Sequence, residues 1–172
     1  MNARNEFIHC AIALACLNIL TVIDNNIISR RPRSMMKSRI YKEVSFDASH
    51  RLPHYQGKCA QLHGHRWRVE VWVEGNIDET TKILVDYNFI RTVVERFDHQ
   101  VILDKDDPMT PCILQFQPVI TTPGDPTSEL LAQLIGELIQ KECLGNGNAV
   151  RVAKVRVWES PNCYAEYKPE SK

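Results

Sequence analysis

Two histidines separated by a single glycine, His63-Gly64-His65, begin a stretch in which polar and apolar residues alternate. Alternation with a period of two is the pattern of a β-strand that buries one face. Residues two apart in a strand point to the same side of the sheet, so both imidazoles share a face. The positions that continue that face are apolar: Trp67, Val69, Val71 and Val73. The motif therefore predicts a strand that carries two imidazoles at one end of its buried face.

A third histidine, His50, ends the preceding segment, which alternates in the same way. The face that it shares consists of Ile40, Val44, Phe46 and Ala48. Residues 51–62, which include His54 and Cys59, form a polar loop between the two predicted strands. If the strands pair as neighbours, three imidazoles converge at the ends that this loop joins. Three neutral nitrogen ligands suit Zn²⁺ and leave a fourth position open, the usual pattern of a catalytic zinc site.

Two other interpretations of these histidines stay open. They could be ordinary histidines of a half-buried sheet, although an HxH pair with a third histidine on an adjacent apolar face favours a metal. Alternatively, Cys59 could be a fourth ligand that closes a structural site. Only the open site leaves room for a substrate oxygen, which an ion held by neutral ligands would polarise.

The chain length and the charge balance limit the classes of protein. A chain of 172 residues is long enough for one domain with its own core. The 21 basic and 21 acidic residues balance, so the composition indicates no nucleic-acid or polyanion partner. The six cysteines show neither a CxxC pair nor the spacing of a disulfide framework, which favours a reduced, cytoplasmic compartment.

Residues 1–38 differ from the rest of the chain. The apolar run from Phe7 to Ile23 is short for a spanning helix, which needs about 20 residues, and the positive charge ahead of it is weak for a signal peptide. The segment could be a disordered or loosely helical extension, a membrane anchor, or the product of a start codon placed too early. We favour the last, with Met35 or Met36 as the true start, because the enzyme-like pattern begins at Arg39. We therefore expect one domain over residues 39–172 and no membrane partner.

Two amphipathic helices are predicted after the histidine strands. Apolar residues at helical spacing predict a helix over residues 87–97, with Asp86 as its N-cap. Pro126 starts a second predicted helix, which has a clean apolar stripe and ends at Gly145. The cap of this second helix is one of the two polar neighbours of the proline, Asp125 or Thr127.

The remaining segments predict strands and one long loop. Residues 103–124 contain four prolines and predict a loop, with a short strand near residues 119–121. Residues 150–159 alternate again, so Ala153, Val155, Val157 and Glu159 would share a face, and residues 163–167 continue as a last strand. The order β, β, α, α, β, β predicts an α+β fold, with helices on one side of an antiparallel sheet.

Three further groups are candidates for chemistry. A carboxylate at the end of an apolar strand face, as at Glu159, is either frayed into water or an acceptor for a ligand with adjacent N–H donors. The Asp98-His99 pair is either a cap that compensates the helix dipole or a proton-transfer pair. Cys59 lies four residues before His63, so it is either an inert loop cysteine or a thiolate whose pKa a neighbouring cation lowers.

Five motifs in this order resemble a known family. They are SFDASHRLPH with His50, Cys59-x-x-x-His63-Gly64-His65, Phe97-Asp98-His99, Pro126-Thr127-Ser128-Glu129 and Val157-Trp158-Glu159. Together they resemble the 6-pyruvoyltetrahydropterin synthase superfamily, most closely its bacterial 6-carboxytetrahydropterin synthase branch in queuosine biosynthesis. The resemblance runs from about Arg39 to Tyr167.

This resemblance implies a fold and an assembly. The fold would be the tunnelling fold (T-fold), a four-stranded antiparallel sheet with two helices on one side. Family members form trimers whose sheets close into a barrel, and two trimers stack into a homohexamer. Their sites lie at subunit interfaces, so Asp98 and His99 would reach the Cys59 of a neighbour.

The resemblance also implies residue roles. The zinc ligands would be His50, His63 and His65. Cys59 would be the catalytic base, and Asp98 with His99 its relay partners.

The same family pattern assigns the substrate contacts. Glu159 would anchor the 2-amino and N3 edge of the pterin, with Thr127 and Ser128 as further contacts. Arg51, Lys58 and Arg66 are candidates for holding the triphosphate, although solvation at the surface is the more common role of such side chains.

The implied reaction converts 7,8-dihydroneopterin triphosphate to 6-carboxy-5,6,7,8-tetrahydropterin, acetaldehyde and triphosphate, with Zn²⁺ and no redox cofactor. Three residues separate Cys59 from His63, as in the carboxy-forming enzymes, whereas the pyruvoyl-forming animal enzymes have a longer gap. A third branch, in folate synthesis, has glutamate in place of the cysteine. The alternatives are triphosphate elimination alone, which gives the pyruvoyl product, and a non-catalytic, zinc-stabilised pterin-binding module.

Overall fold

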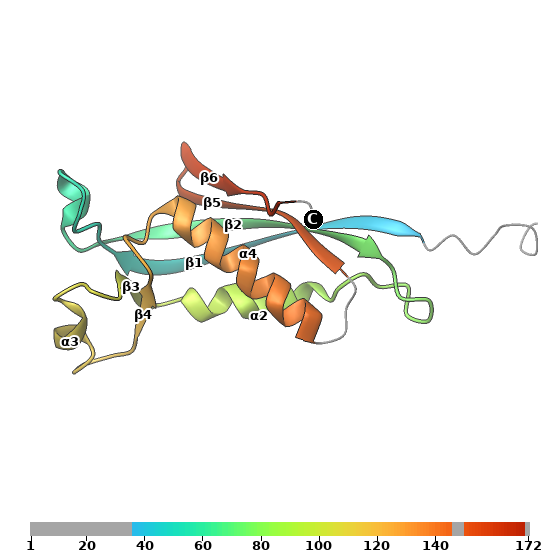
Figure 1. The fold of residues 1–172 in the computed structure, drawn as a ribbon, viewed down its shortest axis with the longest axis horizontal. Coiled ribbons are helices and arrows are strands. Elements are labelled where there is room, and N and C mark those ends of the chain that lie inside the picture. Colours follow the sequence, from blue (N-terminus) through green and yellow to red (C-terminus); the bar gives the residue numbers. More distant parts are fainter. Residues whose placement is uncertain (1–35, 146–149, 171–172) are drawn as a thin grey trace, which may run out of the picture. The chain divides into compact units, whose positions relative to one another are not determined.

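A computed structural model describes residues 36–145 and 150–170 of the chain. Six strands form one sheet in the order β4-β3-β1-β2-β5-β6. The helices α2 and α4 cover one face of this sheet (Figure 1). The predicted α+β class, with helices on one side of a largely antiparallel sheet, is confirmed.

The centre of the sheet is a long hairpin of β1 (Lys37–His50) and β2 (His63–Asn76). The two strands pair antiparallel over their whole length, and the register places His50 opposite His63 and Ala48 opposite His65. The predicted pairing of the two histidine strands is therefore confirmed. All three histidines lie at the end of the hairpin where the loop of residues 51–62 connects the strands.

The other strands extend the sheet on both sides. β5 (Val150–Ser160) pairs antiparallel with β2, and β6 (Cys163–Tyr167) pairs antiparallel with β5, which completes the four expected strands. Beyond β1, two short strands join in parallel, β3 (Gln100–Asp104) and β4 (Val119–Thr122). Within the described residues the sheet thus has six strands, two more than the four-stranded sheet that the family resemblance implies.

The segment predicted as a long loop over residues 103–124 is only partly irregular. It includes the end of β3, a short helix α3 (Thr110–Ile113) and β4, which confirms the strand predicted near residues 119–121. The prolines do not prevent this arrangement, because they lie in the turns and at the first positions of α3, where proline is tolerated.

The first long helix begins where the sequence predicts. Asp86 accepts a hydrogen bond from the Asn88 backbone N–H and is the N-cap of α2 (Tyr87–Val94), which the short turn η2 (Glu95–Phe97) continues. Because Asn88 is one of the first helical residues, this bond satisfies a backbone N–H that has no partner within the helix.

The second helix, α4 (Ser128–Gly145), begins two residues later than predicted and ends at Gly145 as expected. Thr127 caps it, because its hydroxyl accepts from the Leu130 N–H at 3.3 Å. Asp125 is not the cap, and Pro126 lies before the helix. Its carbonyl is therefore free to accept from a side chain elsewhere in the fold.

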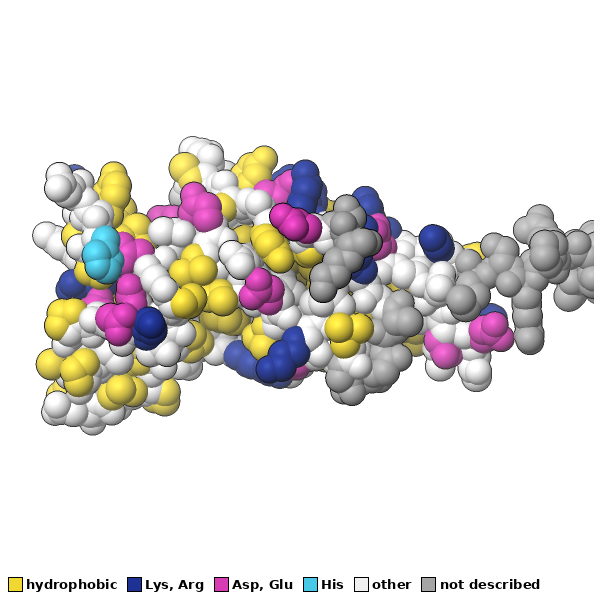
Figure 2. Space-filling view, viewed as in Figure 1, with side chains coloured by type: hydrophobic (Ala, Val, Ile, Leu, Met, Phe, Trp, Pro, Cys, Tyr) yellow, Lys and Arg dark blue, Asp and Glu magenta, His cyan; other side chains and the backbone are white. Residues whose placement is uncertain are grey.

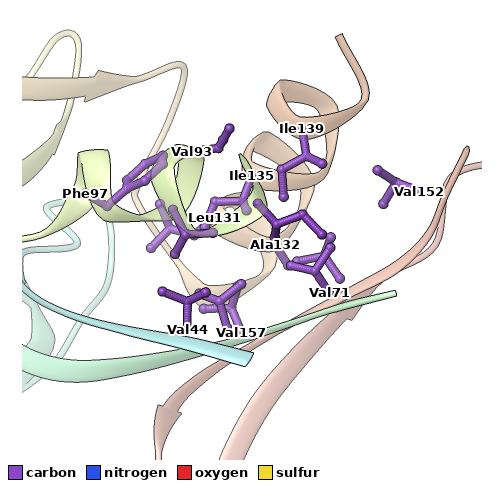
Figure 3. Packing of buried hydrophobic residues seen from close by; sticks show 14 of the residues in the cluster. Val44, Val71, Val93, Phe97, Leu131, Ala132, Ile135, Ile139, Val152 and Val157 are labelled. Atoms are coloured by element: carbon purple, nitrogen blue, oxygen red, sulfur yellow. The ribbon is translucent and has the colours of Figure 1, made fainter. Parts of the chain in front are cut away.

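The core lies between the two helices and the sheet (Figure 3). Leu131, Ile135 and Ile139 of α4 are fully buried, as are Val71 and Val157 of the sheet. Burying one such side chain contributes about 1.5–3 kcal/mol. This packing fixes α4, and with it the residues just before its first turn, against the face of the sheet that carries the histidines.

One prediction for β5 is wrong. The register between β2 and β5 shifts between Trp72 and Val73, which leaves Ala153 without a partner. Val152 and Val155 are both fully buried on either side of this bulge, so Ala153 does not continue the face of Val155. A bulge adds one residue to a strand and reverses the alternation that a sequence pattern assumes.

The predictions for the N-terminal segment lie mostly outside the described residues. β1 begins at Lys37, two residues before the expected domain start at Arg39. Within residues 36–145 and 150–170, no helix is long and apolar enough to span a membrane.

An ion-pair network on β6 gives a test of the fold. Glu166 lies within 2.9 Å of both Lys168 and Arg156, and hydrogen bonds from these residues lower the pKa of Glu166 from 4.5 to about 2. A lowered carboxyl pKa stabilises the fold above the unfolded-state value, and the effect is lost as the pH falls through the folded-state value. We predict that Glu166→Gln lowers the free energy of unfolding by up to about 1 kcal/mol at pH 7, the range of exposed pairs.

The measurement is urea unfolding at several pH values. The difference between Glu166→Gln and wild type should shrink as the pH falls from about 4.5 toward about 2. Glu170→Gln, a substitution at an exposed residue of the same terminal segment, is the matched control and should have little effect at any pH. A deficit for Glu166→Gln that does not change with pH would contradict the prediction.

Candidate metal centre

The hairpin register brings three imidazole rings into mutual contact. The ring centroids of His50 and His63 are 4.5 Å apart, those of His50 and His65 are 5.2 Å apart, and those of His63 and His65 are 4.9 Å apart. One nitrogen from each ring and one carboxylate oxygen of Glu159 all lie within 4.8 Å of one another. This histidine group is the candidate metal centre.

Backbone carbonyls orient two of the rings. His50 Nδ1 lies 2.8 Å from the carbonyl oxygen of Pro126, and His63 Nδ1 lies 2.8 Å from that of Gln61. A carbonyl only accepts, so each Nδ1 carries the proton and donates. The lone pair of a neutral ring is then on Nε2. An outer hydrogen bond of this kind fixes the tautomer and the orientation of a metal-binding histidine.

Two nitrogens of the group lack a hydrogen-bond partner. His50 Nε2 and His65 Nε2 are buried, and neither forms a hydrogen bond with any described residue. His65 Nε2 is 3.3 Å from Glu159 Oε1. The two groups form an ion pair only if the imidazole is protonated. Leaving a buried polar atom unpaired costs free energy, which a bound cation would recover. The donor set therefore fits a metal ion.

The environment of His50 and His65 favours the neutral imidazole, the form that binds a metal. Burial lowers the pKa of His50 from 6.5 to about 4, the hydrogen bond to Pro126 opposes this, and the neighbouring imidazoles add to the decrease. Burial also lowers the pKa of His65, against the attraction of Glu159. Trp67 is the apolar floor of the centre, with its ring centroid 4.8 Å from that of His50.

A strand irregularity directs Glu159 toward the histidines. The register of β5 and β6 shifts between Trp158 and Ser160, so Glu159 lies in a bulge. Bulges re-aim a side chain relative to regular alternation. Its side chain is 28% exposed, so Glu159 is at the rim of the centre and is not frayed into water. The sequence pattern left this residue as either a frayed carboxylate or a ligand acceptor, and it did not predict the position beside His65.

Cys59 lies in a short turn, η1 (Lys58–Ala60), and is half-buried. Its carbonyl accepts from the Leu52 N–H at 2.8 Å, which closes the base of the loop. The group that contains the three histidines has Glu159 as its fourth member and does not include Cys59. The geometry does not support the alternative of a closed site with Cys59 as the fourth ligand.

Asp98 and His99 form a hydrogen-bonded pair at the end of η2. His99 Nδ1 lies 2.9 Å from Asp98 Oδ2, and Asp98 Oδ1 accepts from the Asp47 N–H at 2.9 Å. The bond from Asp47, followed by that from His99, lowers the pKa of Asp98. The His99 backbone is in the left-handed region, with φ of 56°, and its side chain is 81% exposed. The pair is therefore held rigidly while the imidazole remains accessible.

Two hollows flank His65 and share Gly64, His65 and Arg66. One, of about 480 Å³, is also lined by Asp47, Ser49, His99, Gln100 and Gln117. The other, of about 670 Å³, is also lined by Ser45, Arg68, Trp158, Glu159 and Ser160. Glu159 and His99 thus lie on different hollows that meet at a histidine of the centre.

The other predicted substrate contacts have local partners. Thr127 caps α4, and the Ser128 hydroxyl donates to Glu129 at 3.3 Å; neither residue lines the two hollows. Arg51 is tied to the buried Asp107, with 3.0 Å between Nε and Oδ2.

The remaining two triphosphate candidates are exposed. Arg66 lines both hollows with a side chain that is 76% exposed, and Lys58 lies at the tip of the loop. Of the three candidates, only Arg66 has its charge beside a hollow.

The fold and the site together define an α+β domain with a three-histidine metal-type centre at the end of its central hairpin. Residues 39–170 match the family described as 6-pyruvoyl tetrahydropterin synthase. The chain belongs to this family, and is an enzyme of the pterin synthase type.

Individual relatives agree with this assignment. A protein of Rickettsia felis named 6-carboxy-5,6,7,8-tetrahydropterin synthase is 31% identical over 134 residues, which cover 73% of this chain and 96% of the relative. A protein of Aquifex aeolicus with the same name is 30% identical over 162 residues, which cover 78% of this chain and all of the relative. The solved structure of 6-pyruvoyl tetrahydropterin synthase from Caenorhabditis elegans superposes with a TM-score of 0.57 at 25% identity, covering 79% of this chain and 98% of that chain.

Removal of one imidazole tests the centre. We predict that His65→Ala weakens Zn²⁺ binding by more than the roughly 10- to 100-fold that loss of an outer hydrogen-bond partner costs. Competition with a chromogenic chelator measures the affinity. His99→Ala, which removes an exposed imidazole outside the group, is the control and should bind Zn²⁺ like wild type. Equal affinity of His65→Ala and wild type would exclude His65 as a ligand.

Proposed function

We propose that this chain is a zinc-dependent lyase that converts 7,8-dihydroneopterin triphosphate to 6-carboxy-5,6,7,8-tetrahydropterin, acetaldehyde and triphosphate in queuosine biosynthesis. The observation that carries the proposal is the pair of buried Nε2 atoms without a hydrogen bond, on His50 and His65, in a domain that matches the family. The names of the bacterial relatives support the carboxy-forming branch.

In this proposal His50, His63 and His65 hold Zn²⁺ through neutral nitrogens. When bound, the ion supplies Lewis-acid polarisation of the hydroxyl oxygens of the substrate side chain, which makes nearby protons more acidic. The chain's own contribution is a fixed geometry. Pro126 and Gln61 keep the proton on Nδ1 of two rings, and Trp67 excludes water from one side.

In this proposal Cys59 and the Asp98–His99 pair carry out proton transfer. Cys59, as a thiolate, takes a proton from the substrate side chain, and His99 passes the proton on. Asp98 holds the His99 ring through Nδ1 and would stabilise the imidazolium. The exposure of His99 supports a further proposal, that it serves the Cys59 of a neighbouring subunit in a homohexamer built from two trimers.

In this proposal residues at the rim of the histidine group orient the substrate. The Glu159 carboxylate lines the 670 Å³ hollow, where it could accept from the 2-amino and N3 hydrogens of a pterin. We assign it as the pterin anchor and not as a zinc ligand, because a carboxylate ligand would occupy the position that substrate oxygens need. Thr127 and Ser128 complete the contacts in the proposed assembly.

The overall reaction consumes one water molecule and balances without a redox cofactor. The triphosphate leaves as an anion, and a carbon–carbon bond of the side chain then breaks to release acetaldehyde, so the substrate itself supplies the electrons. We propose that residues 39–172 form the catalytic domain and that it acts in the cytoplasm. The spacing of Cys59 and His63 and the cysteine itself favour this reaction over those of the other branches.

An acetaldehyde assay tests the function. The purified, zinc-loaded protein is incubated with 7,8-dihydroneopterin triphosphate, and acetaldehyde, triphosphate and pterin products are measured. The proposal expects acetaldehyde and triphosphate in equal amounts. Triphosphate without acetaldehyde would indicate the pyruvoyl-forming reaction, and neither product would indicate a non-catalytic pterin-binding module; either result rejects the proposal.

Substitution of Cys59 distinguishes a catalytic role of the thiol from a role as a zinc ligand. We predict that Cys59→Ala lowers kcat by about 100-fold or more, the range for a removed acid–base group, with Zn²⁺ content unchanged. Cys112→Ala, at an exposed cysteine in α3, is the matched control and should keep full turnover. Loss of Zn²⁺ from Cys59→Ala would contradict this prediction and would support the alternative in which Cys59 is the fourth ligand of a closed structural site.

Substitution of Glu159 distinguishes a role in anchoring the pterin from a role as a zinc ligand. Glu159→Gln keeps the shape of the side chain but replaces one acceptor oxygen with a donor, so it should repel one N–H of the pterin edge. We predict a fall in kcat/KM of at least about tenfold, since a lost hydrogen bond to a charged group costs about 1.5–3 kcal/mol. Zn²⁺ stoichiometry should stay the same, and a protein that loses Zn²⁺ would instead identify Glu159 as a ligand.

A further inference from the structure

The loop of residues 51–62, which carries Cys59, is tied to the segment before α4 by one residue. His54 Nδ1 lies 2.8 Å from Asp125 Oδ1, and the His54 backbone N–H donates to Asp125 Oδ2 at 3.1 Å. Both oxygens of one carboxylate thus hold both the side chain and the backbone of one loop residue. Residues 54–58 of the loop are exposed, and among the described residues their hydrogen bonds to the rest of the chain are the two to Asp125.

The carboxylate in this contact belongs to a well-fixed segment. The side chain of Asp125 is 16% exposed, and its carbonyl accepts from the Thr127 N–H at 2.7 Å. The next residue, Pro126, accepts the hydrogen bond from His50 of the metal centre. Two consecutive residues before α4 therefore hold two parts of the site. Pro126 orients the candidate ligand His50, and Asp125 holds the Cys59 loop through His54.

The surrounding charges favour a protonated His54. The hydrogen bond and charge of Asp125 raise the pKa of His54, and Asp104 and Asp107 add to the increase. Asp107 is itself paired with Arg51, the first residue of the same loop. Figure 2 shows histidine, acidic and basic side chains gathered at this end of the molecule. When His54 is protonated, the contact is an ion pair with a hydrogen bond, which is stronger than a hydrogen bond between neutral groups.

We infer that the His54–Asp125 contact positions the Cys59 loop over the metal centre, and that its loss lowers turnover without removing the metal. His54 and Asp125 are positioning residues, since neither belongs to the histidine group. The part of this inference that concerns turnover rests on the proposed function, whereas the part that concerns the loop does not.

The opposing explanation is an ordinary surface ion pair. The His54 side chain is 76% exposed, and exposed pairs often contribute almost nothing to stability. The two explanations differ in what they predict for the loop. A positioning contact controls how often the loop opens locally, which is measurable even where global stability barely changes.

Limited proteolysis with trypsin measures loop opening in the full-length, zinc-loaded protein. The bond after Lys58 lies at the tip of the loop, and the bond after Lys141, within α4, serves as an internal reference for the whole fold. The test variants are Asp125→Asn, which keeps the size of the side chain, and His54→Ala. The matched control, Asp106→Asn, removes one neighbouring negative charge, and that carboxylate does not contact His54.

We expect cleavage after Lys58 to be about tenfold faster in Asp125→Asn and His54→Ala, which corresponds to about 1.4 kcal/mol. Cleavage after Lys141 should stay at the wild-type rate, and Asp106→Asn should behave like wild type at both bonds. His54→Asn, whose amide can still donate to Asp125, should restore most of the protection.

Steady-state kinetics and metal analysis complete the test. The two disrupting variants should lose about tenfold in kcat, with KM changed less and with Zn²⁺ content unchanged, and His54→Asn should recover kcat. Equal cleavage after Lys58 in Asp125→Asn and Asp106→Asn would overturn the inference, as would parallel acceleration at Lys141 or a loss of Zn²⁺. If wild type has no turnover while the cleavage pattern is as expected, the proposed function fails and the loop contact stands.

Discussion

The register between β1 and β2 is the constraint on which the site depends. It places His50 opposite His63 and so brings three imidazoles to one end of one face. Side chains alternate along a strand, so a slip of one residue would move the imidazoles of one strand to the opposite face. The buried apolar residues of both strands enforce the register, because the same slip would expose Phe46 or Trp67. Folding of the core and assembly of the metal centre are therefore one event.

The buried face also sets the chemistry of the centre. Burial keeps His50 neutral, and the carbonyls of Pro126 and Gln61 leave the free lone pair of two rings on Nε2. In the absence of an ion, the unpartnered nitrogens cost free energy, and the core between α4 and the sheet offsets this cost. The three imidazoles are therefore preorganised, so that binding of a cation requires little rearrangement of the side chains.

Sequence alone predicted the hairpin, the grouping of the three histidines and the Asp86 cap, because each follows from local periodicity or a local hydrogen bond. It did not predict the bulges at Ala153 and Glu159, since a bulge depends on how two distant strands align. It also missed the roles of the Pro126 and Gln61 carbonyls. Every residue carries a carbonyl, so no residue type signals which one will orient a ring. The sequence also did not predict β3, a strand of five residues whose last two lie in the segment predicted as a loop.

The central claim is that three imidazoles, without the Cys59 thiolate, hold the metal and leave one position open. X-ray absorption at the zinc edge of the zinc-loaded, full-length protein tests this most directly. The account predicts nitrogen ligands at about 2.0–2.1 Å, a light-atom ligand in the remaining position and no sulfur. A sulfur ligand at about 2.3 Å would contradict it, because Cys59 would then close the site and could not act as the base.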